Sequence, residues 1–392
     1  MRPLSAALRT VCLSALALGL ATAVPAHAKT FVYVSNAEDA DIDGYTMDTS
    51  SGALTPIGKT KAGMLVMPMT ISPDKHYLYA VVRSLPLRVV TYAVDPSTGA
   101  LSEKGTAPLP ESMAYLSTDN TGHYLFSASY GGSQVAVNPV DADGIARAAA
   151  IQVIPTGKNA HSIRVDRTNR FVYASNLGDN QVLEFLFDAK TGKLTPNDPP
   201  LLKALPDNGP RHIIISPDNK YLYVICELSG NIIQYAIDQE KGTLKELNYT
   251  GAVPADSGLT PGKARAPTPV NATSGANTVA EGDDSKPKIW AADIQMTPNG
   301  KFVYASERTK GHIALLTVAP ETGKLTYVTN YESEAQPRGI RLDSQGKFLV
   351  VSGEKSTQLS SFKINQETGA LTLVGRYPIG HDANWVEIVD EP

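Results

Sequence analysis

The strongest constraint on the fold is a unit of about 45 residues that recurs seven times, a period typical of repeat architectures. An aromatic and β-branched string marks each copy: Phe31-Val-Tyr33, Tyr77-Leu-Tyr79, Tyr124-Leu-Phe126, Phe171-Val-Tyr173, Tyr221-Leu-Tyr223, Phe302-Val-Tyr304 and Phe348-Leu-Val350. A second marker is a glycine two residues before a leucine, or once an alanine, at Gly52, Gly99, Gly144, Gly192, Gly242, Gly323 and Gly369. The gaps between these glycines are 47, 45, 48, 50, 81 and 46 residues, so two separate markers keep one spacing.

Each unit reads as strands joined by turns. The turn before the aromatic strand contains residues such as Pro73-Asp74, and the later turn is a hairpin such as Thr98-Gly99. Helical periodicity is absent after the N-terminal segment. Four short strands per unit predict an all-β, seven-bladed β-propeller. A solenoid is the alternative, but a solenoid has no reason to stop at seven copies.

The first unit lacks the strand and turn that precede the aromatic string in the other units, because it starts directly at Phe31. The last segment of the chain, Asn384-Trp-Val-Glu-Ile-Val389, has the pattern of that missing strand. We therefore expect the C-terminal strand to pair with the N-terminal blade and close the ring. Closure of this kind leaves no free sheet edge.

Residues 1–28 have the features of a secretory signal peptide. Arg2 and Arg9 precede or flank an apolar run from Val11 to Val24, and Ala26-His27-Ala28 matches the cleavage pattern. The run is shorter than the roughly 20 residues that span a bilayer. The sequence therefore predicts a cleaved signal at 1–28, a propeller at 29–392, a periplasmic or secreted location and no membrane insertion after cleavage.

Charge and cysteine content narrow the function classes. The chain has 35 basic and 39 acidic residues, so loss of Arg2 and Arg9 leaves 33 against 39, a net charge of −6. Such an acidic balance argues against a nucleic-acid or membrane-surface partner. Cys12 is lost with the signal, and Cys226 alone cannot form an internal disulfide, so we expect it to be a core thiol.

The 81-residue gap contains an insertion at approximately 254–288, rich in Ala, Gly, Pro, Thr, Ser and Asp. A flexible surface loop is one interpretation. A lid over the mouth of the channel is the other.

Polar residues cluster where the predicted inner strands begin and where the aromatic strands end. Equivalent positions in successive blades converge, so these residues are expected at one mouth of the channel: Arg83, Tyr130, His161, Asn176, Arg211, His212, Glu227, Arg308, Arg338, Glu354 and His381. They could form structural ion pairs only, or a site for an anion or a developing oxyanion. No zinc pattern, phosphate-binding loop or dinucleotide motif occurs, and the arginines oppose a calcium site, so no metal or cofactor is predicted.

Several strings carry a family resemblance: Ala160-His-Ser-Ile-Arg, Gly209-Pro-Arg-His, Cys226-Glu-Leu-Ser, Ser306-Glu-Arg308 and Gln336-Pro-Arg-Gly. They resemble the lactonase family of seven-bladed propellers, which includes propeller-type 6-phosphogluconolactonases and the fungal carboxy-cis,cis-muconate cyclase. The resemblance implies a cofactor-free lactonase with catalytic residues His161, Arg211, Glu227 and Arg308. The remaining candidates, His212, Asn176, Arg338, Glu354 and His381, would bind the substrate.

Export bears on the substrate, because a phosphorylated lactone of a cytoplasmic pathway is not expected outside the inner membrane. We therefore expect an unphosphorylated aldonolactone such as glucono-1,5-lactone. Arg211 and Arg308 would hold the carbonyl oxygen. Glu227 and His161 would share the roles of base and acid, in an order that the sequence leaves open. The alternatives are a non-catalytic exported propeller that binds a ligand or partner protein, and a lactone isomerase or cyclase.

Overall fold

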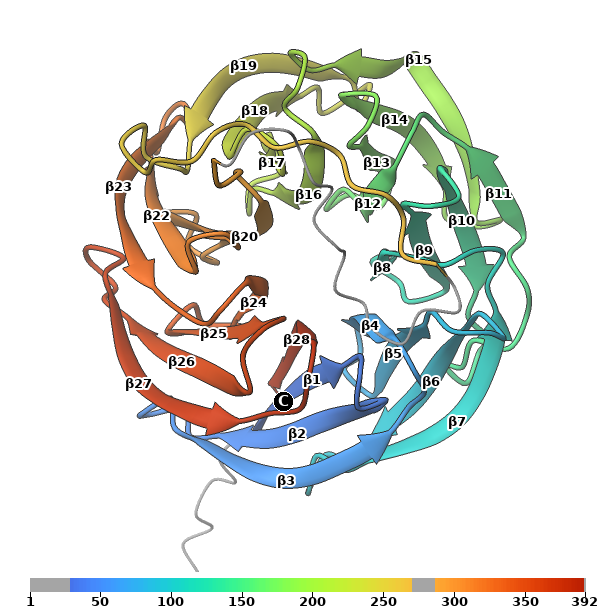
Figure 1. Ribbon diagram of the computed structural model, residues 1–392. Helices are drawn as coiled ribbons and strands as arrows, with labels where there is room; N and C mark the ends of the chain where they lie inside the picture. Colours follow the sequence, from blue (N-terminus) through green and yellow to red (C-terminus); the bar gives the residue numbers. More distant parts are fainter. Residues whose placement is uncertain (1–28, 270–285, 391–392) are drawn as a thin grey trace, which may run out of the picture.

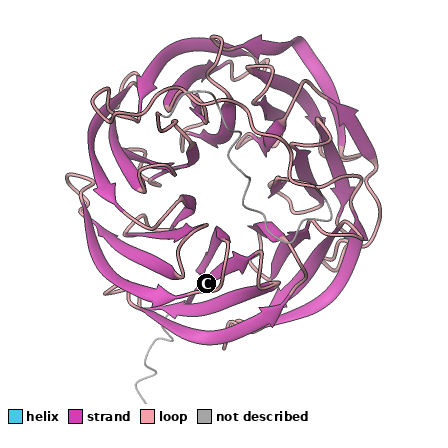
Figure 2. Cartoon of the chain, viewed as in Figure 1, coloured by secondary structure: helices cyan, strands magenta, loops and turns pink. Residues whose placement is uncertain are grey.

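The computed structural model describes residues 29–269 and 286–390, which form a ring of seven four-stranded antiparallel sheets (Figure 1). The described residues contain strands and loops but no helix (Figure 2), and hence none long and apolar enough to cross a membrane. The prediction of an all-β, seven-bladed propeller is confirmed. The predicted signal peptide, 1–28, lies outside the described residues.

The blades are numbered 1 to 7 in chain order, beginning with the blade that contains β1, and each runs outward through four strands. The innermost strands are β28 (Ala383–Asp390), β4 (Val66–Ile71), β8 (Tyr115–Thr118), β12 (Ala160–Val165), β16 (Pro210–Ile215), β20 (Ala291–Met296) and β24 (Pro337–Leu342). The second strands are β1 (Thr30–Asn36), β5 (Tyr77–Val82), β9 (Tyr124–Ser129), β13 (Phe171–Asn176), β17 (Tyr221–Cys226), β21 (Phe302–Glu307) and β25 (Phe348–Gly353). The third strands are β2 (Asp41–Met47), β6 (Arg88–Val94), β10 (Gln134–Pro139), β14 (Gln181–Asp188), β18 (Asn231–Ile237), β22 (His312–Val318) and β26 (Gln358–Ile364). The outer strands are β3 (Leu54–Lys61), β7 (Leu101–Pro108), β11 (Gln152–Pro155), β15 (Lys193–Lys203), β19 (Leu244–Gly251), β23 (Leu325–Glu332) and β27 (Leu371–Pro378).

The ring closes through the C-terminal strand, as the sequence predicts. β28 pairs antiparallel with β1, from Thr30 opposite Asp390 to Asn36 opposite Ala383. The first blade is therefore built from both ends of the described chain, in the order β28-β1-β2-β3.

Burial is greatest in the second strands of the blades and least in the outer strands. Every residue of β1 is buried, whereas most of β3 is exposed. The aromatic strings occupy the second strands, so their side chains pack between neighbouring blades and form the core. Cys226 belongs to this core, as expected, and its thiol is free and buried.

The two sequence markers of each repeat meet across the blade boundaries. The tyrosine hydroxyl of one blade donates to the carbonyl of the marker glycine in the next blade, at 2.6–2.8 Å, in five pairs: Tyr33–Gly99, Tyr79–Gly144, Tyr173–Gly242, Tyr223–Gly323 and Tyr304–Gly369. Where Val350 replaces the tyrosine, Ser361 Oγ donates to Gly52 O instead (2.8 Å). The two markers therefore recur with the same period because the tyrosine of one repeat bonds the glycine of the next.

The same contact explains why the marker is a glycine. All seven marker glycines have φ between +64° and +79°, a region that residues with a Cβ rarely adopt. A Cβ at any of them would lie within 2.5 Å of an aromatic ring of the preceding blade, which is Phe171 for Gly242. The backbone turn and the aromatic ring thus occupy the space that a larger residue would need.

Gly242→Ala is expected to lower the free energy of unfolding by about 3 kcal/mol, from backbone strain and overpacking together. Gly258→Ala is the matched control, because Gly258 has φ +73° but nothing within 4 Å of its Cβ position. Its cost should be about 1 kcal/mol, from the backbone alone. Urea denaturation measures both, and equal losses would show that the contact with Phe171 contributes nothing.

Candidate active site

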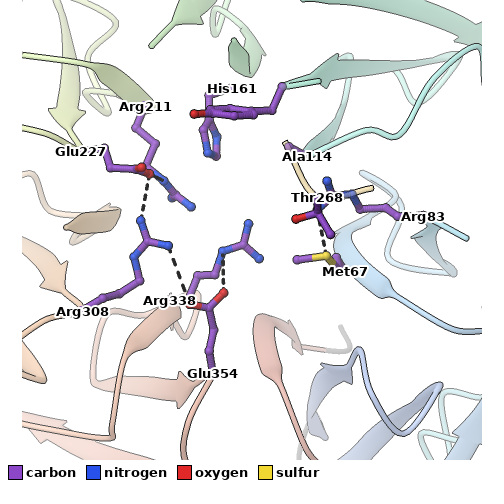
Figure 3. A pocket seen from close by; sticks show the side chains of 11 residues that line it. Met67, Arg83, Ala114, His161, Arg211, Glu227, Thr268, Arg308, Arg338 and Glu354 are labelled. Carbon is purple, nitrogen blue, oxygen red and sulfur yellow. Dashed lines mark hydrogen bonds and ion pairs between the residues drawn. The ribbon is translucent and has the colours of Figure 1, made fainter. Parts of the chain in front are cut away.

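The inner strands carry β-bulges at one end, and these bulges present the candidate residues. In blade 4 the register passes from Ala160 opposite Asn176 to Ser162 opposite Ser175, which leaves His161 as the extra residue. Arg338 is the extra residue in blade 7 in the same way. A bulge redirects the side chain of its extra residue, and here the side chains project into one pocket (Figure 3).

The second group of residues lies directly after the second strands. The backbone N–H of Glu227 donates to Gly209 O, and those of Arg308 and Glu354 make the equivalent bonds to Trp290 O and Gln336 O. These equivalent bonds fix the chain at the same point in each blade. The side chains that follow the strands therefore meet the bulge residues.

The two groups enclose a small pocket with a cavity of about 30 Å³. Its lining residues are Met67, Arg83, Ala114, Tyr130, His161, Arg211, Glu227, Thr268, Arg308, Arg338 and Glu354 (Figure 3). All four predicted catalytic residues line it, together with the predicted substrate-binding residues Arg338 and Glu354.

Glu227 is the centre of a buried ion-pair network. Its Oε2 accepts from Arg211 Nε (2.7 Å) and Arg308 Nη2 (2.8 Å), and its Oε1 accepts from Trp290 Nε1 (3.2 Å). Burial alone would raise the pKa of Glu227, but the charges of Arg308, Arg211 and Arg265 outweigh it and hold the pKa below its usual value. Glu227 is therefore an ionised carboxylate with both oxygens engaged.

The opposite side of the pocket has more cations than anions. Arg338 Nε lies 3.4 Å from Glu354 Oε1, but Arg338 Nη1 is buried and has no hydrogen-bond partner. Arg83 donates to the neutral atoms Ser112 Oγ and Met67 Sδ. Four arginines and two glutamates line the pocket, so its field favours an anion or a developing negative charge.

His161 is a neutral imidazole in this cationic site. Burial and the charges of Arg211 and His212 lower the pKa of His161 well below its ordinary value. Its Nδ1 is buried without a hydrogen-bond partner, and its ring meets that of Tyr130 edge to face, with the centroids 5.6 Å apart. Two of the residues that line the pocket, His161 and Arg338, therefore each carry a buried nitrogen without a hydrogen-bond partner.

Asn176 was predicted at the site, but the structure places it elsewhere. Asn176 pairs with Ala160, whereas Cys226, the residue before Glu227, makes the equivalent pairing with Pro210. Leu177 is thus the counterpart of Glu227 in its blade. Because successive side chains of a strand point to opposite faces, this offset of one residue turns the Asn176 amide away, to Thr156 Oγ1 (3.0 Å).

His212 and His381 do not line the pocket either. His212 shares a bulge with Arg211 but points the other way, where Arg211 Nη1 lies 3.0 Å from its Nε2 and Asp293 Oδ1 lies 2.8 Å from its Nδ1. His212 therefore contacts the Arg211 guanidinium from outside the pocket and helps to hold its position. His381 is exposed at the rim beside Asp39, because it precedes the bulge of its blade by three residues.

The pocket also contains residues outside the predicted catalytic and substrate-binding sets. Arg83 and Tyr130 follow second strands at the same repeat position as Glu227, as the sequence predicts, and both line the pocket. Trp290 shares its repeat position with Gly209 and Gln336, neither of which has an aromatic side chain, and Thr268 lies in the insertion outside the repeats, so the repeat pattern predicts neither side chain. No group of three or more His, Cys, Asp or Glu in residues 29–269 and 286–390 is arranged to hold a metal ion.

Comparison with known proteins extends over nearly the whole chain. Residues 31–388 match the family described as "Lactonase, 7-bladed beta-propeller". A 6-phosphogluconolactonase of Pectobacterium carotovorum is 34% identical over 91% of this chain and 98% of its own. A 6-phosphogluconolactonase of Serratia proteamaculans is also 34% identical, over 92% of this chain and 99% of its own.

Solved structures agree with the fold. A periplasmic gluconolactonase of Pseudomonas aeruginosa is 23% identical with a TM-score of 0.79, over 93% of this chain and 99% of the other. A protein from Lactobacillus plantarum is 21% identical with a TM-score of 0.75, over 92% of this chain and 99% of the other. At these identities the likeness concerns the arrangement of the blades.

Glu227→Gln is expected to destabilise the protein by about 3 kcal/mol, because it leaves Arg211 and Arg308 buried without their shared counter-charge. Glu103→Gln, on the exposed face of β7, is the control and should change stability by no more than about 0.5 kcal/mol. Urea denaturation provides the measurement. Equal stability of the two variants would contradict a structural role for the Glu227 network.

Proposed function

Because the chain belongs to the lactonase family of seven-bladed β-propellers, we propose that the pocket hydrolyses the ring ester of a sugar lactone and releases the aldonic acid. The observation that carries this proposal is that two residues lining one buried pocket each have a nitrogen without a hydrogen bond. His161 Nδ1 has no hydrogen-bond partner, and neither has Arg338 Nη1. Ester hydrolysis needs a proton acceptor for water and a donor for the carbonyl oxygen.

In the first step, neutral His161 accepts a proton from a water molecule while the water oxygen bonds to the lactone carbonyl carbon. Negative charge then develops on the carbonyl oxygen, and Arg338 Nη1 stabilises it. Arg308 Nη1 lies 3.7 Å from Glu354, too far for a strong bond, and is available as a second donor. In the second step the bond to the ring oxygen breaks, and the His161 imidazolium returns its proton to that oxygen.

This assignment separates roles that the sequence left open. Glu227 is ionised and accepts from two arginines and Trp290, so it is a poor proton acceptor. We propose that Glu227 positions Arg211 and Arg308. His161 acts as the general base in the first step and as the general acid in the second. Arg338 replaces Arg211 as the main donor to the carbonyl oxygen, since the Arg211 Nε and Nη1 groups are already bonded to Glu227, His212 and Ala292.

For the substrate we propose an unphosphorylated aldonolactone such as glucono-1,5-lactone, hydrolysed in the periplasm. This proposal is supported by the signal-peptide pattern of residues 1–28, which predicts export. An exported protein would not meet the phosphorylated lactones of a cytoplasmic pathway.

A second candidate is a lactone that carries an anionic group, such as the phosphorylated lactone named in the curated relatives. The excess of arginines over glutamates in the pocket favours it, and Arg83 in particular faces neutral partners. An anionic group bound beside Arg83 and Arg338 would lower the electrostatic cost of burying both cations.

Purified mature protein should accelerate the opening of glucono-1,5-lactone above its spontaneous rate in a pH-indicator assay. A panel with 6-phosphogluconolactone decides between the two candidates through the ratio of kcat/KM values. A higher value for the phosphorylated lactone would overturn the first candidate. No acceleration on any lactone would overturn the enzymatic proposal.

His161→Gln should lower kcat about 100-fold with little change in the fold, because it removes the proton acceptor. In the unchanged protein, His161 must be neutral to act, and its pKa lies well below 6.5. The value of kcat/KM should therefore stay constant from pH 8 down to 6.5 and fall only at lower pH. Exposed His123→Gln is the control. An inflection near pH 7, or full activity of His161→Gln, would contradict this role.

A further inference from the structure

The insertion between blades 5 and 6 is fixed at its base to the residues of the site. We call residues 259–269 the strap. Gly262 N donates to Leu228 O (2.7 Å), directly after Glu227, and Ile289 N donates to Thr260 O (2.8 Å), directly before Trp290. A Cβ at Gly262 would lie 2.5 Å from Ile289 O, so only glycine permits this approach.

From this base the strap crosses to blade 3 over the strand ends (Figure 1). There the Tyr130 hydroxyl accepts from Arg265 N (3.1 Å) and donates to Arg265 O (2.9 Å). Pro267 lies against Gly131, and Thr268 reaches the lining of the pocket beside Met67 and Arg83 (Figure 3). The strap is therefore attached to the ring on both sides of the pocket.

The Arg265 side chain points back toward the network around Glu227. Its guanidinium lies over the ring of Trp290, whose Nε1 donates to Glu227. Burial and the charge of Arg308 lower the pKa of Arg265 to about 10, which still leaves it protonated at neutral pH. The guanidinium of Arg308 also lies over Trp290, 3.6 Å from the ring centroid. Through Arg265 the strap thus contacts Trp290, which is hydrogen-bonded to Glu227.

The size of the pocket shows what the strap does to access. A cavity of about 30 Å³ holds one or two water molecules, whereas small-molecule sites usually measure roughly 300 Å³ or more. Ten of the lining residues lie on inner strands or directly at strand ends, within the packed ring. Thr268, in the strap, is the eleventh, so the strap is the part of the wall that the blade sheets do not hold.

We propose that the strap is the gate of the site, that the structure shows it closed, and that the double hydrogen bond from Tyr130 is its latch. A lactone reaches His161 and Arg338 only when Arg265 leaves Tyr130 and Trp290. The strap then determines which lactones are admitted, through a segment outside the seven repeats. This inference rests on the proposed function for the identity of the ligand, but not for the motion itself.

The decisive experiment locks the gate with a disulfide. A Cβ at Gly131 would lie 3.2 Å from Pro267 Cβ, a few tenths of an ångström short of the roughly 3.5–4.5 Å between the Cβ atoms of bridged cysteines, and both residues are exposed. The double variant Gly131→Cys with Pro267→Cys should lose at least 50-fold in kcat/KM for glucono-1,5-lactone when oxidised. Reduction with dithiothreitol should restore the rate, and the two single variants should show no redox effect. An oxidised double variant as active as its reduced form would overturn the gate.

A second readout does not require catalysis. The chain has two tryptophans, so in a Trp385→Phe background Trp290 is the sole source of tryptophan fluorescence. Its ring lies against the Arg265 guanidinium, so its emission is expected to change when the strap moves. Titration with glucono-1,5-lactam, which cannot be hydrolysed at its ring, should change Trp290 emission in the reduced double variant but not in the oxidised one. A protein without lactonase activity that still shows this difference would overturn the proposed reaction and keep the gate. Equal emission changes in both redox states would overturn the gate alone.

The latch is tested by Tyr130→Phe, which removes both bonds to Arg265. Trypsin should then cleave after exposed Lys263 in the strap about tenfold faster. Tyr249→Phe is the matched control, because the Tyr249 hydroxyl also makes two hydrogen bonds, to Leu205 N and Glu246, on an outer strand. Equal cleavage rates in the two variants would overturn the role of Tyr130.

Discussion

The contact between an aromatic strand of one blade and a glycine turn of the next is the interaction on which the ring depends. A first aromatic residue covers the Cα of the glycine, and a tyrosine two positions later donates to its carbonyl, as Phe171 and Tyr173 do with Gly242. Each sheet is thereby fixed to its neighbour at the outside of the ring. A ring fixed in this way can hold polar and charged groups at its centre without collapsing onto them.

The centre shows what this rigidity permits. Buried charges are costly unless they are paired, and in the pocket Glu227 forms ion pairs with both Arg211 and Arg308. Three atoms of the lining residues are left without a hydrogen bond: His161 Nδ1, Arg338 Nη1 and Glu354 Oε2. In a packed interior such atoms are exceptions, and here the two nitrogens lie on the extra residues of bulges. These two bulges thus contribute reactive side chains to a structural repeat, because each inserts one residue that has no partner on the neighbouring strand.

Repetition made the fold predictable from sequence. Seven copies of two markers defined the blades, and the missing strand before Phe31 defined the closure by the C-terminal segment. The same repetition found His161, Arg211, Glu227, Arg308, Arg338 and Glu354, because equivalent positions meet at one end of a propeller. The prediction was wrong at Asn176, which lies one residue before the counterpart of Glu227, and one residue is enough to reverse the direction of a strand side chain. The strap lies outside the repeat, and Trp290 shares its repeat position with residues that are not aromatic, Gly209 and Gln336, so no internal copy predicts the contacts of either.

Closure by β28 also imposes an order on assembly. This strand is synthesised after every other strand, yet it is the innermost strand of the first blade and the only partner of β1 on that side. It also places Glu387 against Arg341 of blade 7, at 2.8 Å. The sheet that begins at the N-terminal end therefore waits, with an open edge, until the last segment of the ring arrives. A chain interrupted before β28 has neither a complete first blade nor a closed ring to surround the pocket.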